Sequence, residues 1–416
     1  MSSNPKAYVC FVLDFYQPTT QTTNVAKKIV EEAYFPILRL INTSDHGRFT
    51  ISITQSLFQV LHRIGYEEEV RQLLRQALDN ERLDLAHSGA YHSVLPLLPI
   101  DEVRRQIELD LAFKKEQLAI DSRAGFFLPE LCYDDKLLPL IQEMGFKWTL
   151  VDDQLAGLYG ITVPTSNIYH VNGLSVFMRS SLWSNALTSK HWSGLAFVRH
   201  LERHAEQLGR DSYTIVSLSA ETFGHHMPWY HETFLKDMLF AATNSVSVEL
   251  CAVSDLLNKH KIRQTGTPVR EAGKTGRFTC TWFPPSSWAT SADDDRRGDS
   301  YPHWRSRGNP IHDYLWQLTE LILDSCRGMD FGEPRNAALR NLLDQSFYSC
   351  QYYWASIWFW NPELVYLGID LQMRALYKCA RLTGNLDALA QGERIYRNLM
   401  RNIHVRQVEE KGKRRS

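Results

Sequence analysis

Short apolar segments alternate with amphipathic helical patterns along the first 260 or so residues, and this rhythm restricts the possible folds more than any other feature. The apolar segments are rich in β-branched and aromatic side chains, which is typical of strands buried on both faces. Regular alternation of strand and helix is typical of a parallel sheet with helical crossovers. We expect strands at residues 8–13, 49–53, 82–86, 125–128, 147–151, 175–177 and 213–218.

This pattern predicts an α/β fold, an incomplete (β/α)7 barrel followed by a helical C-terminal domain. We expect the barrel over residues 1–265, an irregular Trp-bearing connecting segment over residues 266–310, and the helical domain over residues 311–416. Helical periodicity in that last domain predicts helices at residues 311–326, 334–356, 362–382 and 386–404. In β/α barrels the reactive groups lie at the carboxyl ends of the strands.

Charge and cysteine content exclude several classes of function. Lys and Arg number 46 against 47 for Asp and Glu, so no net field favours nucleic acid or an anionic membrane. No apolar run is long enough to span a bilayer. Seven scattered cysteines, without metal-binding spacing, predict a reducing, cytoplasmic location. We therefore expect no nucleic-acid partner, no membrane partner and no cofactor.

Polar residues follow four of the predicted strands. They are Asp14, Tyr16 and Gln17 after the first, His87 and His92 after the third, Glu130 after the fourth, and Ser219, Glu221, His225, His226 and Trp229 after the last. Singly, such residues are most often helix caps or solvated side chains, but together they predict an active site. The chain also holds 11 Trp and 18 Tyr, whose flat faces suit sugar rings but also fill large cores.

Several motifs resemble those of glycoside hydrolase family 57. The segment FLPELCY, which holds Glu130, resembles the family's nucleophile motif, GAYHSVLPLLP is similar to its second motif, and SAETFGHH to its fourth. Residues 179–186 are similar to the third motif, and YYWASIWFWNPELV resembles the Trp-bearing helix of the C-terminal region. The resemblance covers roughly residues 8–380.

The resemblance implies an incomplete (β/α)7 barrel with a helical domain, acting with retention on an α-glucan or oligosaccharide. The implied reactions are hydrolysis, 4-α-glucanotransfer and branching. It implies Glu130 as the nucleophile. The residues expected to bind substrate are Asp14, Tyr16, Gln17, His92, Arg179, Trp183, Ser219, His225, His226, Trp229, Trp354 and Trp358.

Two positions depart from the family's motifs. The acid/base Asp is replaced by Ser219, and a serine hydroxyl is too weak an acid to protonate a departing sugar oxygen. The first motif, His-x-His-Gln-Pro, begins here with Asp14 and has Tyr16 in place of its second His. A retaining mechanism requires a second carboxyl group near the nucleophile. The weaker candidates for a replacement acid are Glu221, His225, His226, Asp152 and Asp153.

Two other interpretations follow from the same residues. In one, the chain is a catalytically silent carbohydrate-binding homologue whose cleft still binds glucan. In the other, it is similar to metal-dependent polysaccharide deacetylases, with Asp14, His87 and His92 as metal ligands. The two His are five residues apart, whereas that family spaces its pair by four.

Overall fold

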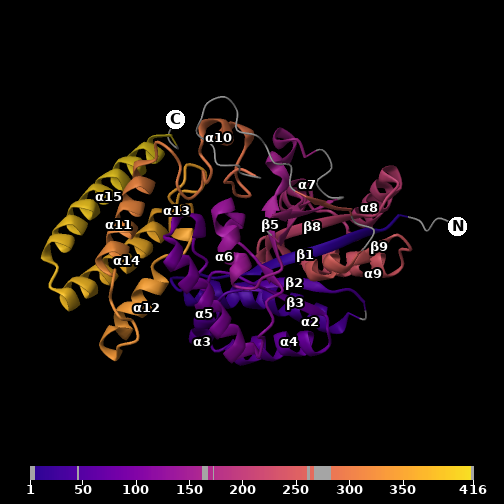
Figure 1. Cartoon of the computed structure of the whole chain (residues 1–416), viewed down its shortest axis with the longest axis horizontal. Coiled ribbons are helices and arrows are strands. Elements are labelled where there is room, and N and C mark those ends of the chain that lie inside the picture. The colour runs from indigo at the N-terminus through magenta and orange to yellow at the C-terminus, as the bar shows by residue number, and fades with distance from the viewer. Residues whose placement is uncertain are drawn as a thin grey trace. The chain divides into compact units, whose positions relative to one another are not determined.

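The computed structural model describes residues 5–44, 46–161, 167–171, 173–259, 263–266 and 283–413, with only the backbone described at 263–266 and 411–413. The chain divides into two compact units, a barrel unit of residues 1–90 and 95–292, and a helical unit of residues 91–94 and 293–416 (Figure 1). Of the expected connecting segment, residues 267–282 lie outside the described residues, 283–292 belong to the barrel unit and 293–310 to the helical unit.

The strands of the barrel unit are β1 (Ala7–Phe15), β2 (Phe49–Ile53), β3 (Leu83–His87), β4 (Gly125–Phe126), β5 (Trp148–Asp152), β6 (Asn167–Val171), β7 (Leu174–Arg179), β8 (Ser212–Ser219), β9 (Val248–Leu250) and β10 (Arg263–Gly266). Seven of them form a parallel ring in the order β1-β2-β3-β4-β5-β7-β8. The ring closes where β8 pairs with β1 along its whole length and with β7 at Arg179 and Ile215. The predicted (β/α)7 barrel is therefore confirmed.

Three additional strands extend the barrel sheet. Strand β9 pairs with the amino half of β1, β6 lies antiparallel to β7, and β10 pairs with β6. All seven predicted strands are present, within a few residues of their expected bounds. The sequence did not predict β6, β9 and β10, because short edge strands bury little apolar surface and leave a weak pattern.

Helices cover the outside of the barrel. They are α1 (Thr23–Ile29), α2 (Phe35–Thr43), α3 (Gln55–Ile64), α4 (Glu67–Asp79), α5 (Ile100–Leu118), α6 (Leu138–Glu143), α7 (Ser181–Ser189), α8 (Gly194–Leu208) and α9 (Asp237–Thr243). A π-helical turn η1 (Val30–Tyr34) joins α1 to α2, and a second, η8 (His231–Lys236), precedes α9. The short helix α10 (Ala292–Arg297) begins where the barrel unit ends.

Strand alternation sorts the apolar side chains of the barrel into two layers. On β1, Val9, Phe11 and Leu13 face outward and pack against the surrounding helices. Tyr8, Cys10 and Val12 face inward and pack with side chains from β5, β7 and β8. Because successive side chains on a strand point to opposite faces, this assignment also fixes which residues at the strand ends face the interior.

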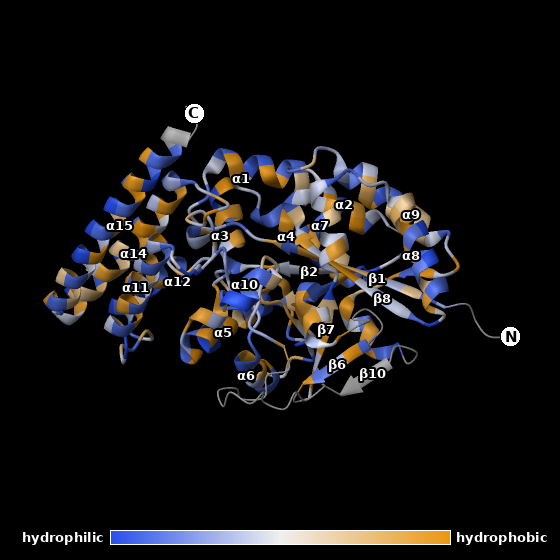
Figure 2. Ribbon diagram, turned by 90° about the horizontal axis from the view of Figure 1, so that it is seen from above, coloured by the Kyte–Doolittle hydropathy of each residue, from blue (hydrophilic) through white to orange (hydrophobic). Residues whose placement is uncertain are grey.

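The helical unit consists mainly of α11 (Pro310–Ser325), α12 (Ala337–Gln345), α13 (Cys350–Tyr353), α14 (Pro362–Thr383) and α15 (Leu386–Lys413). Figure 2 shows these helices with apolar stripes beside polar ones, as expected for helices packed on one side. Trp316 of α11 stacks on Tyr352 of α13 with ring centroids 4.2 Å apart. Among the described residues, no helix is both long and apolar enough to cross a membrane.

The continuous helix predicted over residues 334–356 is wrong, because the structure breaks it between α12 and α13. Ser346 Oγ donates to the Leu343 carbonyl at 2.8 Å, and Gln351 Nε2 donates to the Ser346 carbonyl at 2.6 Å. These side chains bond to the backbone locally and compete with the helical pattern. Tyr348 also forms an isolated antiparallel bridge with Ser93 of the segment 91–94.

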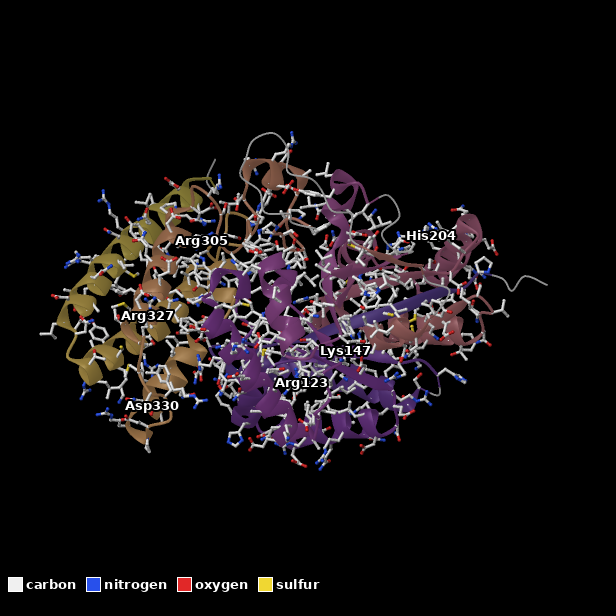
Figure 3. The ribbon with its side chains drawn as sticks, viewed as in Figure 1. Arg123, Lys147, His204, Arg305, Arg327 and Asp330 are labelled. Carbon is white, nitrogen blue, oxygen red and sulfur yellow. The ribbon has the colours of Figure 1, made fainter. Side chains whose placement is uncertain are left out.

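The two ends of the barrel can be located from residues labelled in Figure 3. Arg123 and Lys147 come just before β4 and β5, so they mark the amino end of the parallel strands. His204, near the end of α8, precedes β8 and marks the same end. The predicted active-site residues of the barrel unit that follow its strands therefore lie at the opposite, carboxyl end.

Gly125 is required by close packing inside the barrel, which generates a stability prediction. A Cβ atom at Gly125 would lie 2.0 Å from the Trp148 indole, which is fully buried on the next strand. We expect Gly125→Ala to lower the free energy of unfolding by about 1–3 kcal/mol, the usual cost of overpacking. Gly157→Ala is the matched control, since a Cβ there meets no atom within 4 Å. Equal stability of the two variants in urea denaturation would contradict this account.

Candidate active site at the carboxyl end of the barrel

Four strands bring polar side chains to the interior at the carboxyl end of the barrel. The inward positions Tyr8, Cys10 and Val12 of β1 continue to Asp14, and those of β8 continue from Ile215 to Ser219. By the same alternation, Asp152 ends the inward face of β5 and Arg179 that of β7. We call this set, together with Glu130, Asp153 and Glu221, which follow β4, β5 and β8, the barrel rim.

Glu130 follows β4 in a short turn, η3 (Pro129–Leu131), with a left-handed backbone at φ 57°. Left-handed backbone is uncommon for residues with a Cβ and is often retained at functional sites. The indole N–H of Trp288 donates to Glu130 Oε2 at 3.1 Å. Trp288 itself packs against the inward apolar cluster, so the half-buried Glu130 carboxylate lies above the barrel interior.

Asp14 lies between two serines at the rim. Its register partners are Ser219 on β8 and Ser52 on β2, so these three inward positions are level across neighbouring strands. Asp14 is half-buried and Ser219 is exposed. Ser219 Oγ accepts from the backbone N–H of Glu221 at 3.3 Å and caps the turn η7 (Ala220–Phe223).

Asp152 and Arg179 form a buried ion pair across β5 and β7, where they are register partners. The Arg179 Nε also donates to the Ser217 carbonyl at 3.1 Å. Burial raises the pKa of Asp152 to about 6, although the charge of Arg179 opposes this effect. Arg179 is 4% exposed, which leaves little of its side chain accessible for the expected sugar contact.

Asp153, the next residue along the chain, accepts a hydrogen bond from the Ser181 N–H at 2.9 Å, and burial raises the pKa of this carboxyl too.

A second polar group joins Gln17, Glu221 and His226. The Gln17 amide donates to Glu221 Oε1 at 2.6 Å and to the Tyr34 hydroxyl at 3.1 Å, and His226 Nε2 lies 3.2 Å from Glu221 Oε2. The hydrogen bond to Glu221 raises the pKa of His226. Both carboxylate oxygens of Glu221 are thus engaged, one by an amide and one by an imidazole.

Tyr34 links this group to Asp14. Burial raises the pKa of Tyr34 well above its ordinary value, and the negative charges of Glu221 and Asp14 raise it further. The Tyr34 hydroxyl donates to the carbonyl of the buried Tyr16 at 3.1 Å. The carboxyl groups of Asp14 and Glu221 are therefore both near one phenol.

The two remaining candidates after β8 differ in their contacts: the His225 ring lies beside that of His226, with centroids 5.6 Å apart, and Trp229 is exposed. His225 Nδ1 is 2.7 Å from Glu32 Oε2 on η1. This contact joins the segment after β8 to the π-helical turn between α1 and α2. Trp229 is 71% exposed and has a left-handed backbone at φ 63°. A large indole held exposed in this way fits a sugar platform, and its role stays a prediction.

Trp183 was expected to contact sugar, and this expectation is wrong. It is 6% exposed and packs in the outward core, between the barrel and its helices. Its ring makes edge contacts with Phe197 at 4.8 Å and Trp192 at 5.0 Å between ring centroids. Trp183 lies on the buried face of α7, together with Ser184 and Leu187.

The metal site proposed from Asp14, His87 and His92 does not form. His87 faces outward from β3, with Nδ1 2.9 Å from Asp110 on α5 and Nε2 3.0 Å from the Ser122 carbonyl. Both ring nitrogens are therefore occupied, on the face opposite to Asp14. Among the described side chains, no cluster of three His, Cys, Asp or Glu could hold a metal ion.

Three candidates belong to the helical unit. His92 is 2% exposed and its Nδ1 lies 2.9 Å from Ser349 Oγ, which leaves almost no imidazole surface for a sugar. Trp358 is 70% exposed in the turn after α13, and Trp354 is half-buried. Sugar contacts by these two tryptophans stay predictions.

The sequence analysis missed Trp288, the residue that holds Glu130. It lies 158 residues further along the chain, in a stretch without helical or strand periodicity. It also missed that Asp152 pairs with Arg179, because the strands β5 and β7 are separated in the chain by the β6 excursion. Pairing between distant segments has no local signal in a single sequence.

Comparison with known proteins agrees with this architecture. The family model for glycosyl hydrolase family 57 matches residues 12–269. This match covers more than half of the chain, including the carboxyl end of β1 and the other six strands of the parallel ring. The chain belongs to glycosyl hydrolase family 57. This is a family of glycoside hydrolases and transglycosylases. A comparison with curated protein sequences finds no match.

Solved structures of family 57 enzymes share the fold over nearly the whole chain. A branching enzyme from Pyrococcus horikoshii aligns with TM-score 0.65 and 15% identity over 94% of both chains. The α-amylase AmyC from Thermotoga maritima aligns with TM-score 0.64 and 13% identity over 95% of this chain and 97% of its own. A 4-α-glucanotransferase from Thermococcus litoralis aligns with TM-score 0.67 and 15% identity over 91% of this chain, which spans 60% of its length.

The buried ion pair at the rim generates a second stability prediction. Removing one partner leaves the other charge buried, which costs about 3–5 kcal/mol. We expect Asp152→Ala to destabilise by that amount in urea denaturation, and the double variant Asp152→Leu/Arg179→Met to recover most of it. Asp121→Ala, at an exposed carboxylate, is the control. A change under about 1 kcal/mol in Asp152→Ala would show that the pair contributes little.

The contact between Glu221 and His226 predicts a measurable pKa change. Glu221→Gln removes the hydrogen bond and the charge that raise the pKa of His226, so this pKa should fall toward its ordinary value. NMR titration of the imidazole measures it, with Glu232→Gln as a control at an exposed carboxylate. In the native chain the raised pKa stabilises the fold below the unfolded pKa, and the effect is lost as pH rises through the folded pKa. An unchanged pKa in Glu221→Gln would refute the contact.

Proposed function

We propose that this chain is a retaining enzyme of α-glucans, a hydrolase or transglycosylase, with Glu130 as its nucleophile. The observation that carries the proposal is the setting of Glu130 at the barrel rim. Its carboxylate follows β4 in strained backbone and accepts a hydrogen bond from Trp288 above the barrel interior. Family membership and the names of similar structures, an amylase, a branching enzyme and a glucanotransferase, support the substrate class.

Three features of this setting suit a nucleophile. The turn η3 and its left-handed residues fix the direction of the side chain, so little orientation entropy remains to be lost on reaction. The indole N–H of Trp288 donates to one carboxylate oxygen of Glu130 and so helps to fix the orientation of this carboxylate. The half-buried position gives access from the open end of the barrel while excluding part of the solvent.

The remaining rim residues fit substrate binding in this proposal. The half-buried Asp14 and Glu221 present polar groups, and the exposed Trp229 offers a flat apolar face. Gln17 is 2% exposed and instead helps to hold Glu221 through its hydrogen bond. Pyranose rings present both hydroxyl groups and apolar C–H faces, so such a mixture matches them. The substrate we propose is an α-glucan or its oligosaccharides. The cytoplasmic location expected from the cysteines belongs to the same proposal.

A trapping experiment tests the nucleophile. A 5-fluoro-α-maltosyl fluoride reacts quickly to form the glycosyl ester but releases it slowly, so the intermediate accumulates. We expect one maltosyl adduct by mass spectrometry, mapped to the peptide that holds Glu130. Glu130→Gln should give no adduct and lose glucan turnover by several orders of magnitude.

Glu143→Gln is the matched control, because this exposed Glu on α6 pairs with Arg104 at 3.0 Å away from the rim. It should label and turn over like the native chain. An adduct at another carboxylate would refute the role of Glu130. Binding of maltoheptaose by calorimetry, without adduct or turnover, would instead support the catalytically silent carbohydrate-binding interpretation.

A further inference from the structure

A retaining mechanism requires a second carboxyl group across the substrate from Glu130, about 5–5.5 Å from it, and the register of the barrel strands indicates which residue supplies it. This argument rests on the proposed function. We propose that Asp14 is the general acid and base, acting from β1 at the position level with Ser219 on β8.

Barrel topology supports this assignment. In the ring β1-β2-β3-β4-β5-β7-β8, strand β4 is three steps from β1 in one direction and three steps from β8 in the other. These two neighbouring strands therefore face β4 across the interior. Glu130 follows β4, so a group opposite it must come from the end of β1 or of β8.

At those two strand ends, the level inward positions are Asp14 and Ser219. Register partners on neighbouring strands lie about 4.8 Å apart, a distance that a carboxylate side chain can span. Ser219 cannot protonate a departing alkoxide at neutral pH, whereas Asp14 carries a carboxyl group at the same level. The residues level with Asp14 on the two neighbouring strands, Ser52 and Ser219, both have short side chains.

The other rim carboxylates are less suited to give up and take back a proton. Asp152 is 2% exposed and paired with Arg179, so substrate cannot reach it. Asp153 is the acceptor for the N–H of Ser181. Both carboxylate oxygens of Glu221 are already engaged, one by the Gln17 amide and the other by the His226 imidazole.

The reaction balances as two displacements. Glu130 attacks the anomeric carbon and forms an ester bond, the glycosidic C–O bond breaks, and its electron pair stays on the leaving oxygen, which takes the proton of Asp14. Asp14, now a carboxylate, then removes a proton from water or from an acceptor hydroxyl. That oxygen attacks the anomeric carbon, and the ester electron pair returns to Glu130.

Substrates that differ in leaving group test the role of Asp14. Maltoheptaose needs a proton on the leaving oxygen, whereas α-maltosyl fluoride loses fluoride with little help. We expect Asp14→Asn to lower turnover of maltoheptaose by about 10²–10⁴-fold, the usual worth of a general acid, and to lower fluoride release far less. Added azide should accelerate the variant and give α-maltosyl azide, because azide attacks without a general base.

Two further variants complete the test. Asp14→Asn/Ser219→Asp places a carboxyl group at the level position on β8 and should regain at least tenfold of the lost maltoheptaose turnover. Asp121→Asn, an exposed position near the amino end of β4, is the matched control for the substitution. Thermal unfolding of each variant shows whether it is folded. If Asp14→Asn is unfolded, the double variant and an Asp14→Glu variant, which keeps the acid, are compared in its place.

The outcomes separate the two proposals. Equal losses on both substrates without azide rescue, or unchanged turnover of maltoheptaose in Asp14→Asn, would overturn the assignment of Asp14 while an adduct at Glu130 still supports the proposed function. A native chain that turns over neither substrate and gives no adduct would overturn the proposed function and this inference with it.

Discussion

Closure of a seven-strand parallel ring is the constraint on which the rest of the barrel unit depends. Once β8 pairs with β1 along its length and with β7 at Arg179, every second side chain of each strand must fit one enclosed interior. The lower part of that space is filled by large rings such as Trp148, which requires a glycine at position 125 beside it. At the carboxyl end the same alternation leaves polar side chains facing one another.

Each carboxylate at the barrel rim has a different set of hydrogen-bond or ion-pair partners. Asp152 is buried against Arg179, and the cost of removing both from water is offset by their contact and by the Ser217 carbonyl. Glu221 is held by an amide and an imidazole, and Glu130 by an indole. The carboxyl groups of one rim therefore differ in their hydrogen-bond partners and in their exposure to solvent. A retaining mechanism needs two carboxyl groups in different roles, because one must attack while the other donates a proton.

Most of the fold could be predicted from the sequence because each buried parallel strand appears in it as a short, continuous run of apolar residues. The segment at 49–53 is wholly buried and has the predicted bounds, and the helix predicted over residues 362–382 is α14, which ends one residue later. The break between α12 and α13 was missed because it depends on side-chain to backbone hydrogen bonds and on a bridge to Ser93, more than 250 residues away. Trp183 was misjudged because a motif does not say toward which side a helix turns its residues.

The sequence by itself determined the barrel, the family and the chemical types present after each strand, since these depend on local periodicity and on motifs. The tertiary structure decided which of those residues meet. It brought Trp288 to Glu130 and paired Asp152 with Arg179, it turned His87 outward to Asp110, and it set Asp14 level with Ser219. The physical reason is that strand register and ring closure are properties of pairs of distant segments. The sequence of a single strand does not say which strand will be its neighbour or which residues will be its register partners.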